Sequence, residues 1–234
     1  MTIAIIPARG GSKRIPHKNT RFFCGQPMIA YSIAACQEAN IFQRILVSTD
    51  DPEIADIAVA LGAEVPFLRP ASVSDDHSGT DEVMAQVLTQ LTANGVQHEL
   101  ACCVYATAPF IRSVDLVAGW RVIQLAEVDY AFSAATFTHP IARAFTELES
   151  GGLVMVNPQN YHTRSQDLPV AWHDAGQFYW GKTDAWLQRR PIFDIKSRIV
   201  ELQRCRVQDI DTYEDWHYAE LMWRAQKDMH DVGR

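Results

Sequence analysis

The sequence lacks the marks of several common protein classes. No apolar run approaches the roughly 20 residues that span a bilayer, so we expect no membrane segment. The first residues enter a strand-like run directly, and we therefore expect no signal peptide. No Cys-x-x-Cys pair occurs among the five cysteines, which argues against a zinc site. Their number is odd, and we interpret all five as reduced thiols in a cytoplasmic protein.

Basic residues are scarce for a nucleic-acid-binding protein. The 234 residues include 21 Lys and Arg against 28 Asp and Glu, for a formal net charge of -7. A broad basic face is what neutralises the phosphates of a nucleic acid, so we expect neither nucleic acid nor membrane as a partner. A small anionic ligand held in a local basic pocket suits this composition better.

Three widespread functional motifs are also absent. There is no Gly-x-Ser-x-Gly elbow, which disfavours a serine hydrolase. There is no Walker loop, and no Gly-x-Gly-x-x-Gly follows the first strand-like run. The missing glycine fingerprint disfavours a nicotinamide oxidoreductase, although such enzymes share the alternation of strands and helices seen in this chain.

Strand-like runs and helical patterns alternate through the first half of the chain. Strands are expected over 2–6, 44–48, 100–106 and 130–135, and helices over 28–38, 52–61, 80–93 and 114–126. This alternation predicts an α/β, Rossmann-like fold with a mostly parallel central sheet flanked by helices. An apolar fraction of 47% permits a sizeable core.

The pattern changes after about residue 137. Short strands at 142–147 and 153–156 flank Glu149-Ser150-Gly151-Gly152, which is a hairpin signal. A polar stretch follows, and then strands at 175–181 and 198–202 and a helix over 212–227. We interpret the chain as a single domain, residues 1–234, with an inserted hairpin segment at about 137–172.

The most informative segment follows the first strand. Its sequence is Ile6-Pro7-Ala8-Arg9-Gly10-Gly11-Ser12-Lys13-Arg14-Ile15-Pro16-His17-Lys18-Asn19. Glycines let backbone N–H groups approach an anion, and Arg and Lys bind phosphate oxygens. Ligands of open parallel sheets bind beyond the carboxyl ends of the strands, which is where this loop lies. A basic surface turn is the alternative interpretation.

Two carboxylates near the end of the chain form a second candidate site. Asp209 and Asp211 are two residues apart, so on an extended chain they share one face. Such a pair is costly unless a cation lies between its members, and Mg²⁺ binds through one or two carboxylates plus substrate phosphates. The alternative is that Asp211 only caps the last helix while Asp209 is solvated.

A third cluster combines amide, aromatic and cationic side chains. Arg164 and Gln166 could hold a carboxylate or hydroxyls, and Gln177 and Tyr179 are expected on one face of a strand. Such side chains suit a sugar. Phe178 and Trp180, on the other face, are interpreted as ordinary core aromatics.

These segments together resemble the CMP-sialic-acid-synthetase group of sugar cytidylyltransferases. The resemblance rests on residues 6–19 and on segments in register at 47–51, 67–70 and 209–212, and it covers essentially the whole chain. Residues 23–27, 107–111, 163–168 and 173–181 look closest to the members that act on pseudaminic acid, an activity linked to flagellin glycosylation.

The resemblance implies that CTP and a nonulosonic acid give a CMP-sugar and pyrophosphate, with Mg²⁺ as cofactor. It implies a homodimer in which the inserted hairpin reaches the partner's site. The implied nucleotide-binding residues are Ala8, Arg9, Gly10, Gly11, Ser12, Lys13, Asn19, Arg69 and Thr80. Arg9, Lys13 and Asp211 are the implied catalytic residues, and Asp209 and Asp211 the metal ligands. Tyr105, Arg164, Gln166, Gln177 and Tyr179 are expected to face the sugar.

One departure bears on the choice of sugar. Sialic acid synthetases have Gln-Pro-Thr-Ser-Pro where this chain has Tyr105-Ala106-Thr107-Ala108-Pro109. The missing glutamine argues against sialic acid itself and favours a different nine-carbon sugar, and the segments named above favour pseudaminic acid. N-acetylneuraminate, legionaminate and 3-deoxy-octulosonate stay open as substrates, and a non-catalytic nucleotide-sensing module stays open as a function of another class.

Overall fold

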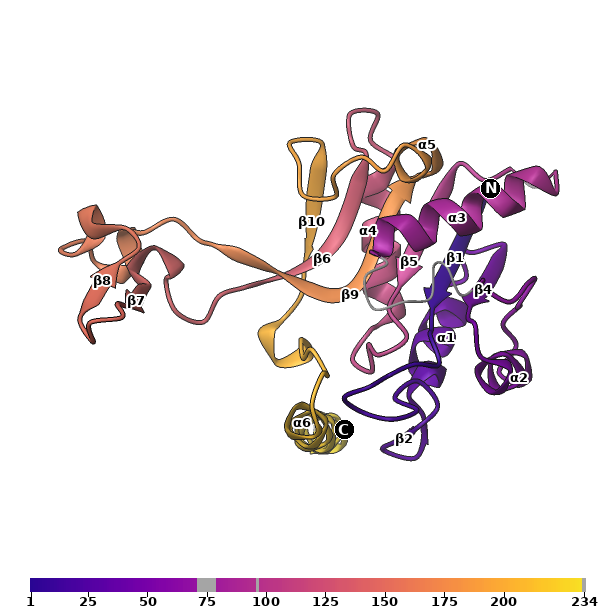
Figure 1. Ribbon diagram of the computed structural model, residues 1–234, viewed down its shortest axis with the longest axis horizontal. Coiled ribbons are helices and arrows are strands. Elements are labelled where there is room, and N and C mark those ends of the chain that lie inside the picture. The colour runs from indigo at the N-terminus through magenta and orange to yellow at the C-terminus, as the bar shows by residue number, and fades with distance from the viewer. Residues whose placement is uncertain (71–78, 96, 233–234) are drawn as a thin grey trace.

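A six-stranded sheet lies at the centre of the protein (Figure 1). The computed structural model describes residues 1–70, 79–95 and 97–232, with residues 227–232 described by their backbone alone. The strands, in spatial order, are β10 (Ser197–Glu201), β6 (Tyr130–Thr136), β9 (Trp172–Lys182), β5 (Leu100–Val104), β1 (Thr2–Pro7) and β4 (Arg44–Ser48).

The sheet is mostly parallel, as predicted, with one reversed strand. β1 pairs in parallel with β4 and β5, and β10 pairs in parallel with β6. β9 runs antiparallel to both of its neighbours, β5 and β6. The inner strands are nearly continuous apolar runs because helices cover the sheet on both faces.

Helices form a layer on each face of the sheet. The helices α1 (Met28–Ala39), α2 (Pro52–Ala60) and α4 (Ser113–Ile123) contribute to one apolar cluster. On the other face, α3 (Thr80–Ala93) and α5 (Thr183–Leu187) contribute to a second. The helix expected over 114–126 is α4, which begins at Ser113 and ends at Ile123. The α/β prediction is confirmed.

The last helix, α6 (Tyr213–Val232), closes the carboxyl end of the sheet against the loop that follows β1. Trp216 and Ala219 pack with Ile15 and with Phe23 of a two-stranded ribbon, β2 (Phe22–Phe23) and β3 (Gln26–Pro27). This third apolar cluster joins the two ends of the chain. No helix in the described part of the chain is long and apolar enough to cross a membrane.

The segment between β6 and β9, residues 137–171, projects from the sheet and is called the arm (Figure 1). The predicted hairpin is present as β7 (Phe145–Glu147) and β8 (Leu153–Met155), with short 3-10 helices at Ile141–Arg143, Pro158–Asn160 and Ser165–Asp167. The first of these helices follows Pro140 and delays the start of β7 to Phe145. Several large apolar side chains of the arm are exposed, among them Phe145, Leu153, Val156 and Tyr161.

Candidate active site

A cavity of about 300 Å³ opens at the carboxyl end of β1. It lies where the fold rule places ligands of such sheets. Six of the residues expected to bind nucleotide line it: Arg9, Ser12, Lys13, Asn19, Arg69 and Thr80. The structure thus brings together residues that are up to about 70 positions apart in the sequence.

The loop after β1 is fixed to the neighbouring strand by its backbone. Ala8 N donates to Ser48 O over 2.9 Å, and Gly10 N donates to Asp50 Oδ1 over 3.0 Å. A side chain at Gly10 would meet Asp51, with the added Cβ only 2.5 Å from Oδ2, whereas nothing lies within 4 Å of a Cβ at Gly11. Gly10 is therefore required by packing. Ala8, Gly10 and Gly11, which were expected to bind nucleotide, do not line the cavity.

Two buried polar side chains support this cavity. Asn19 is buried, and its Nδ2 donates to the carbonyl of Arg9 over 2.9 Å. Arg69 is also buried, 3.8 Å from Asp50, and burial lowers the pKa of its guanidinium. A second Arg in the site adds to that lowering, since Arg9 is near. The charge of Asp50 opposes that lowering, and Arg9 and Arg69 both line the cavity.

One carboxylate, that of Asp211, lines the same cavity and is paired with two cations. Arg14 Nη2 lies 2.9 Å from Asp211 Oδ2. Lys18 Nζ donates to Ile210 O over 2.6 Å and lies 3.4 Å from Asp211 Oδ1. The two ends of the chain therefore meet in one site, as the cationic loop and the carboxylate pair suggested.

The start of α6 shows that residues other than Asp211 cap the helix. Asp215 Oδ2 accepts hydrogen bonds from the backbone N and Oγ1 of Thr212, both at 2.8 Å, and Thr212 Oγ1 accepts from Asp215 N. These reciprocal bonds form a capping box. Because Thr212 and Asp215 cap the helix, the carboxylate of Asp211 faces the cavity instead.

Asp209 and Asp211 are the candidate donors for a divalent metal ion. Partial burial, and then the charge of Asp211, raise the pKa of Asp209, so the two carboxylates repel each other. Two carboxylates supply the hard oxygen donors that suit Mg²⁺, which takes its remaining ligands from substrate phosphates and water. In the described part of the chain no cluster of three or more His, Cys, Asp or Glu residues could hold a metal alone.

A second cavity of about 310 Å³ adjoins the first and shares Thr80 and Tyr105 with it. The hydroxyls of these two residues are 2.7 Å apart. Tyr179 also lines the second cavity, with its ring centroid 5.3 Å from that of Tyr105. The Tyr179 hydroxyl donates to Asp174, and burial, followed by the nearby Tyr105 and Asp174, raises the Tyr179 pKa.

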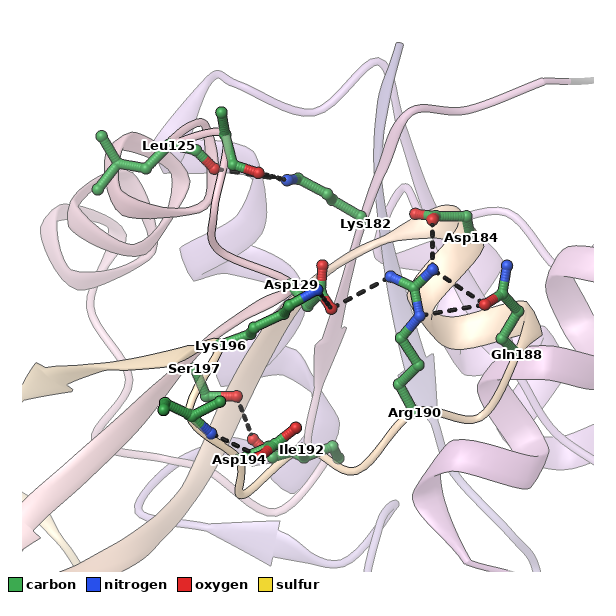
Figure 2. Close-up of polar contacts among 12 residues, drawn as sticks. Leu125, Asp129, Lys182, Asp184, Gln188, Arg190, Ile192, Asp194, Lys196 and Ser197 are labelled. Atoms are coloured by element: carbon green, nitrogen blue, oxygen red, sulfur yellow. Dashed lines mark hydrogen bonds and ion pairs between the residues drawn. The ribbon is translucent and has the colours of Figure 1, made fainter.

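The loop from α5 to β10 forms the outer wall of the second cavity with Ile192 and Phe193. Figure 2 shows how this loop is anchored. Arg190 lies between Asp129 and Asp184, at 3.1 and 3.0 Å, and Ser197 Oγ donates to Ile192 O. Sequence reasoning missed this wall, because Arg-Arg-Pro-Ile-Phe carries no motif.

The other residues expected to face the sugar lie elsewhere. Gln177 is buried and lines neither cavity, since its Nε2 donates to the carbonyl of Arg206 over 2.5 Å. Arg164 and Gln166 are exposed on the arm, where Arg164 pairs with Asp167 over 2.7 Å. Neither arm residue lines either of these two cavities.

Comparison with known proteins gives one consistent family. The cytidylyltransferase family matches over residues 3–230. The pseudaminic acid cytidylyltransferase of Campylobacter jejuni is 39% identical over 95% of this chain and 96% of its own length. A Helicobacter pylori protein named as that enzyme and a sugar hydrolase is 35% identical over 89% of this chain and 40% of its own length. The solved structure of CMP:2-keto-3-deoxy-manno-octonic acid synthetase complexed with CTP shares the fold, with a TM-score of 0.70 at 15% identity over 96% of this chain and 99% of its own. The chain therefore belongs to the cytidylyltransferase family.

Proposed function

We propose that the protein transfers CMP from CTP to pseudaminic acid and releases pyrophosphate. The observation that carries the proposal is the meeting of the cationic loop and Asp211 at one cavity, with Arg14 2.9 Å from Asp211. The substrate follows from relatives named pseudaminic acid cytidylyltransferase, two of which are 39% identical over nearly the whole chain.

Arg9 and Lys13 hold the triphosphate in this proposal. Both line the first cavity on the loop after β1. The attacking hydroxyl of the sugar displaces pyrophosphate at the α-phosphorus, and negative charge spreads over the phosphate oxygens as it does so. Positioning and charge neutralisation are the main contributions of a protein to such a step, and both side chains supply them on the leaving-group side.

Asp209 and Asp211 hold the metal ion, which we propose to be Mg²⁺. When bound, this ion neutralises charge on the α-phosphate and favours ionisation of the attacking hydroxyl. Asp211 lines the cavity and Asp209 does not, so Asp211 is the carboxylate we assign to accept the proton of that hydroxyl. Lys18 donates a hydrogen bond to the carbonyl of Ile210, the residue between the two aspartates, and this bond fixes the backbone that carries them.

The sugar acid occupies the second cavity, next to the nucleotide. Thr80 and Tyr105 line both cavities, which supports a position of the anomeric hydroxyl between them. Tyr105 and Tyr179 offer hydroxyls to the sugar, while Ile192 and Phe193 offer apolar surface to its acyl and deoxy positions. This mixed wall supports a sugar acid that is less hydroxylated than sialic acid.

A homodimer would complete the sugar site. The exposed apolar side chains of the arm support an interface there, and Arg164 is exposed on the same segment. We assign Arg164 to the carboxylate of the sugar acid in the partner's site, where a guanidinium can bind it with two hydrogen bonds. The five cysteines are all free thiols, which supports a cytoplasmic enzyme.

Mixing two inactive variants tests the shared site. If Arg164 acts across the dimer, Arg164→Ala and Asp211→Asn each lose activity, but a mixed dimer keeps one intact site. After subunit exchange about a quarter of all sites are intact, because half of the dimers are mixed and half of their sites are wild type. Activity that stays at the level of the separate variants would place Arg164 outside the partner's site.

Pyrophosphate release measures the proposed reaction directly. Purified protein is assayed with Mg²⁺, each of the four ribonucleoside triphosphates, and pseudaminic, legionaminic, N-acetylneuraminic and 3-deoxy-octulosonic acids. We expect turnover with CTP and pseudaminic acid, and far lower kcat/KM with the other acids. Preference for another acid would overturn the substrate, and absence of turnover with every acid would favour nucleotide sensing.

A further inference from the structure

The buried contacts of Gln177 point away from the substrate cavities. Its side chain is 3% exposed, and Nε2 donates to the carbonyl oxygen of Arg206 over 2.5 Å. Its own Oε1 has no hydrogen-bond partner among the described residues. A leucine would remove the unpaired Oε1 but would also remove the donor to Arg206 O, so the contribution of the amide is its bond to Arg206.

Arg206 is held at its side chain as well as at its carbonyl. It ends the 3-10 helix Arg204–Arg206 and is 5% exposed. Its Nη1 and Nη2 donate to the two carboxylate oxygens of Asp115, at 2.5 and 3.2 Å, and Asp115 lies in the first turn of α4. Arg206 is thus fixed to strand β9 by the hydrogen bond from Gln177 and to helix α4 by the two hydrogen bonds from its guanidinium to Asp115.

The segment that follows Arg206 carries the two aspartates. Asp209 comes three residues later, and Ile210 is then buried in the apolar cluster beneath α6. The carbonyl of Ile210 accepts from Lys18 over 2.6 Å. Arg206 and Ile210 are therefore the two fixed points of the segment, and Asp209 lies between them.

We propose that Gln177 and Arg206 are positioning residues that set the affinity of the Asp209 and Asp211 pair for its metal ion. The inference rests on the metal role given to that pair in the proposed function. Neither residue lines a cavity, so neither touches substrate. Groups that orient metal ligands change metal affinity when they are removed, even though they make no bond to the ion.

Gln177→Leu is the main test. It keeps the volume but leaves the Arg206 carbonyl without its donor. We expect the Mg²⁺ concentration for half-maximal activity to rise about tenfold. The KM for the sugar acid at saturating Mg²⁺ should stay near the wild-type value. Gln86→Leu on α3 is the matched control, because Gln86 is a partly buried glutamine that lines neither cavity.

Direct metal binding provides a readout other than turnover. Free Mn²⁺ is followed by electron paramagnetic resonance as enzyme and CTP are titrated without sugar acid. Gln177→Leu and Arg206→Lys should both bind Mn²⁺ about tenfold more weakly than wild type and Gln86→Leu. Arg206→Lys keeps the positive charge beside Asp115 but loses the fork, so it tests the same anchor if Gln177→Leu does not fold.

Unchanged Mn²⁺ binding in a folded Gln177→Leu or Arg206→Lys variant would overturn the positioning role. An equal loss in Gln86→Leu would also overturn it, because the effect would then not come from the anchor. Asp209→Asn separates this inference from the function on which it rests. If Asp209→Asn binds Mn²⁺ normally, the metal site itself is wrong, whereas weak binding by Asp209→Asn and normal binding by Gln177→Leu would refute the anchor alone.

Discussion

Two adjacent glycines in the loop after β1 should respond differently to the same substitution. Gly10→Ala places a Cβ 2.5 Å from Asp51 Oδ2 and 2.8 Å from Asp51 Cβ. Asp51 cannot turn away freely, because it is the N-cap of α2 and accepts from Glu53 N over 2.8 Å. The substitution must therefore displace either the loop or the cap.

The size of the effect follows from these two options. Overpacking costs about 1–3 kcal/mol, and loss of an N-cap costs about 1 kcal/mol. We expect Gly10→Ala to lower the free energy of unfolding by about 2 kcal/mol, which for this chain length lowers the melting temperature by about 4–8 °C. The KM for CTP should also rise, because the same loop carries Arg9 and Lys13.

Gly11→Ala is the control that the chain itself provides. Nothing lies within 4 Å of a Cβ at Gly11 and its φ is not positive, so the change should alter stability by less than about 1 kcal/mol. Thermal melts followed by circular dichroism measure both variants. Equal melting temperatures for Gly10→Ala and Gly11→Ala would refute the reasoning.

Three further predictions concern catalysis, pH and buried hydroxyls. Asp211→Asn should lower kcat by about 10²-fold or more at saturating Mg²⁺ in the pyrophosphate assay, and near wild-type turnover would remove its catalytic role. Burial, and then the charge of Arg44, lower the pKa of His98 in the folded protein. As the pH falls, His98 therefore takes up a proton in the unfolded chain before it does so in the folded one, and stability should fall between about pH 7.5 and 5.5. His98→Gln should flatten that dependence in urea titrations, and an unchanged slope would contradict it. Tyr130→Phe should stabilise the protein by about 1 kcal/mol, because the buried hydroxyl has no partner among the described residues. Tyr31→Phe should destabilise it by a similar amount, because that hydroxyl donates to the carbonyl of Phe23 over 2.6 Å. If both substitutions changed the free energy of unfolding in the same direction, the two predictions would be refuted.

The sequence was informative where chemistry and backbone pattern coincide. Alternating apolar runs predicted the sheet and its helices, and the loop after β1 was recognisable because a strand leads directly into glycines and cations. The meeting of that loop with Asp211 could be expected from the shared sheet edge and the chemistry of polyphosphates. The capping box at Thr212 was not foreseen, although its Thr-x-x-Asp spacing was visible in the sequence.

Strand alternation misled where the strand is irregular. Gln177 was expected to face the sugar with Tyr179, but it is buried and lines neither cavity, and the register of β9 shifts against β6 between Phe132 and Ala134. There Ser133 Oγ accepts from the backbone N of both Gln177 and Phe178 at 3.2 Å, and Gly176 has a φ of 60°. Such a bulge redirects a side chain, and single-sequence periodicity cannot detect it. The wall formed by Ile192 and Phe193 could not be predicted either, since only tertiary folding brings it to the site.

The place of β9 in the sheet has a consequence for how the chain folds. β9 lies between β5 and β6, so those two strands cannot be joined until residues 172–182 have been synthesised and the arm has turned back. On the ribosome, β1, β4 and β5 can pair early, but the free edge of β5 must wait for a distant segment. Pairings between remote segments are slow and leave unpaired edges exposed to aggregation. Refolding should therefore be limited by insertion of β9, and chains halted before residue 172 should be the species that chaperones retain.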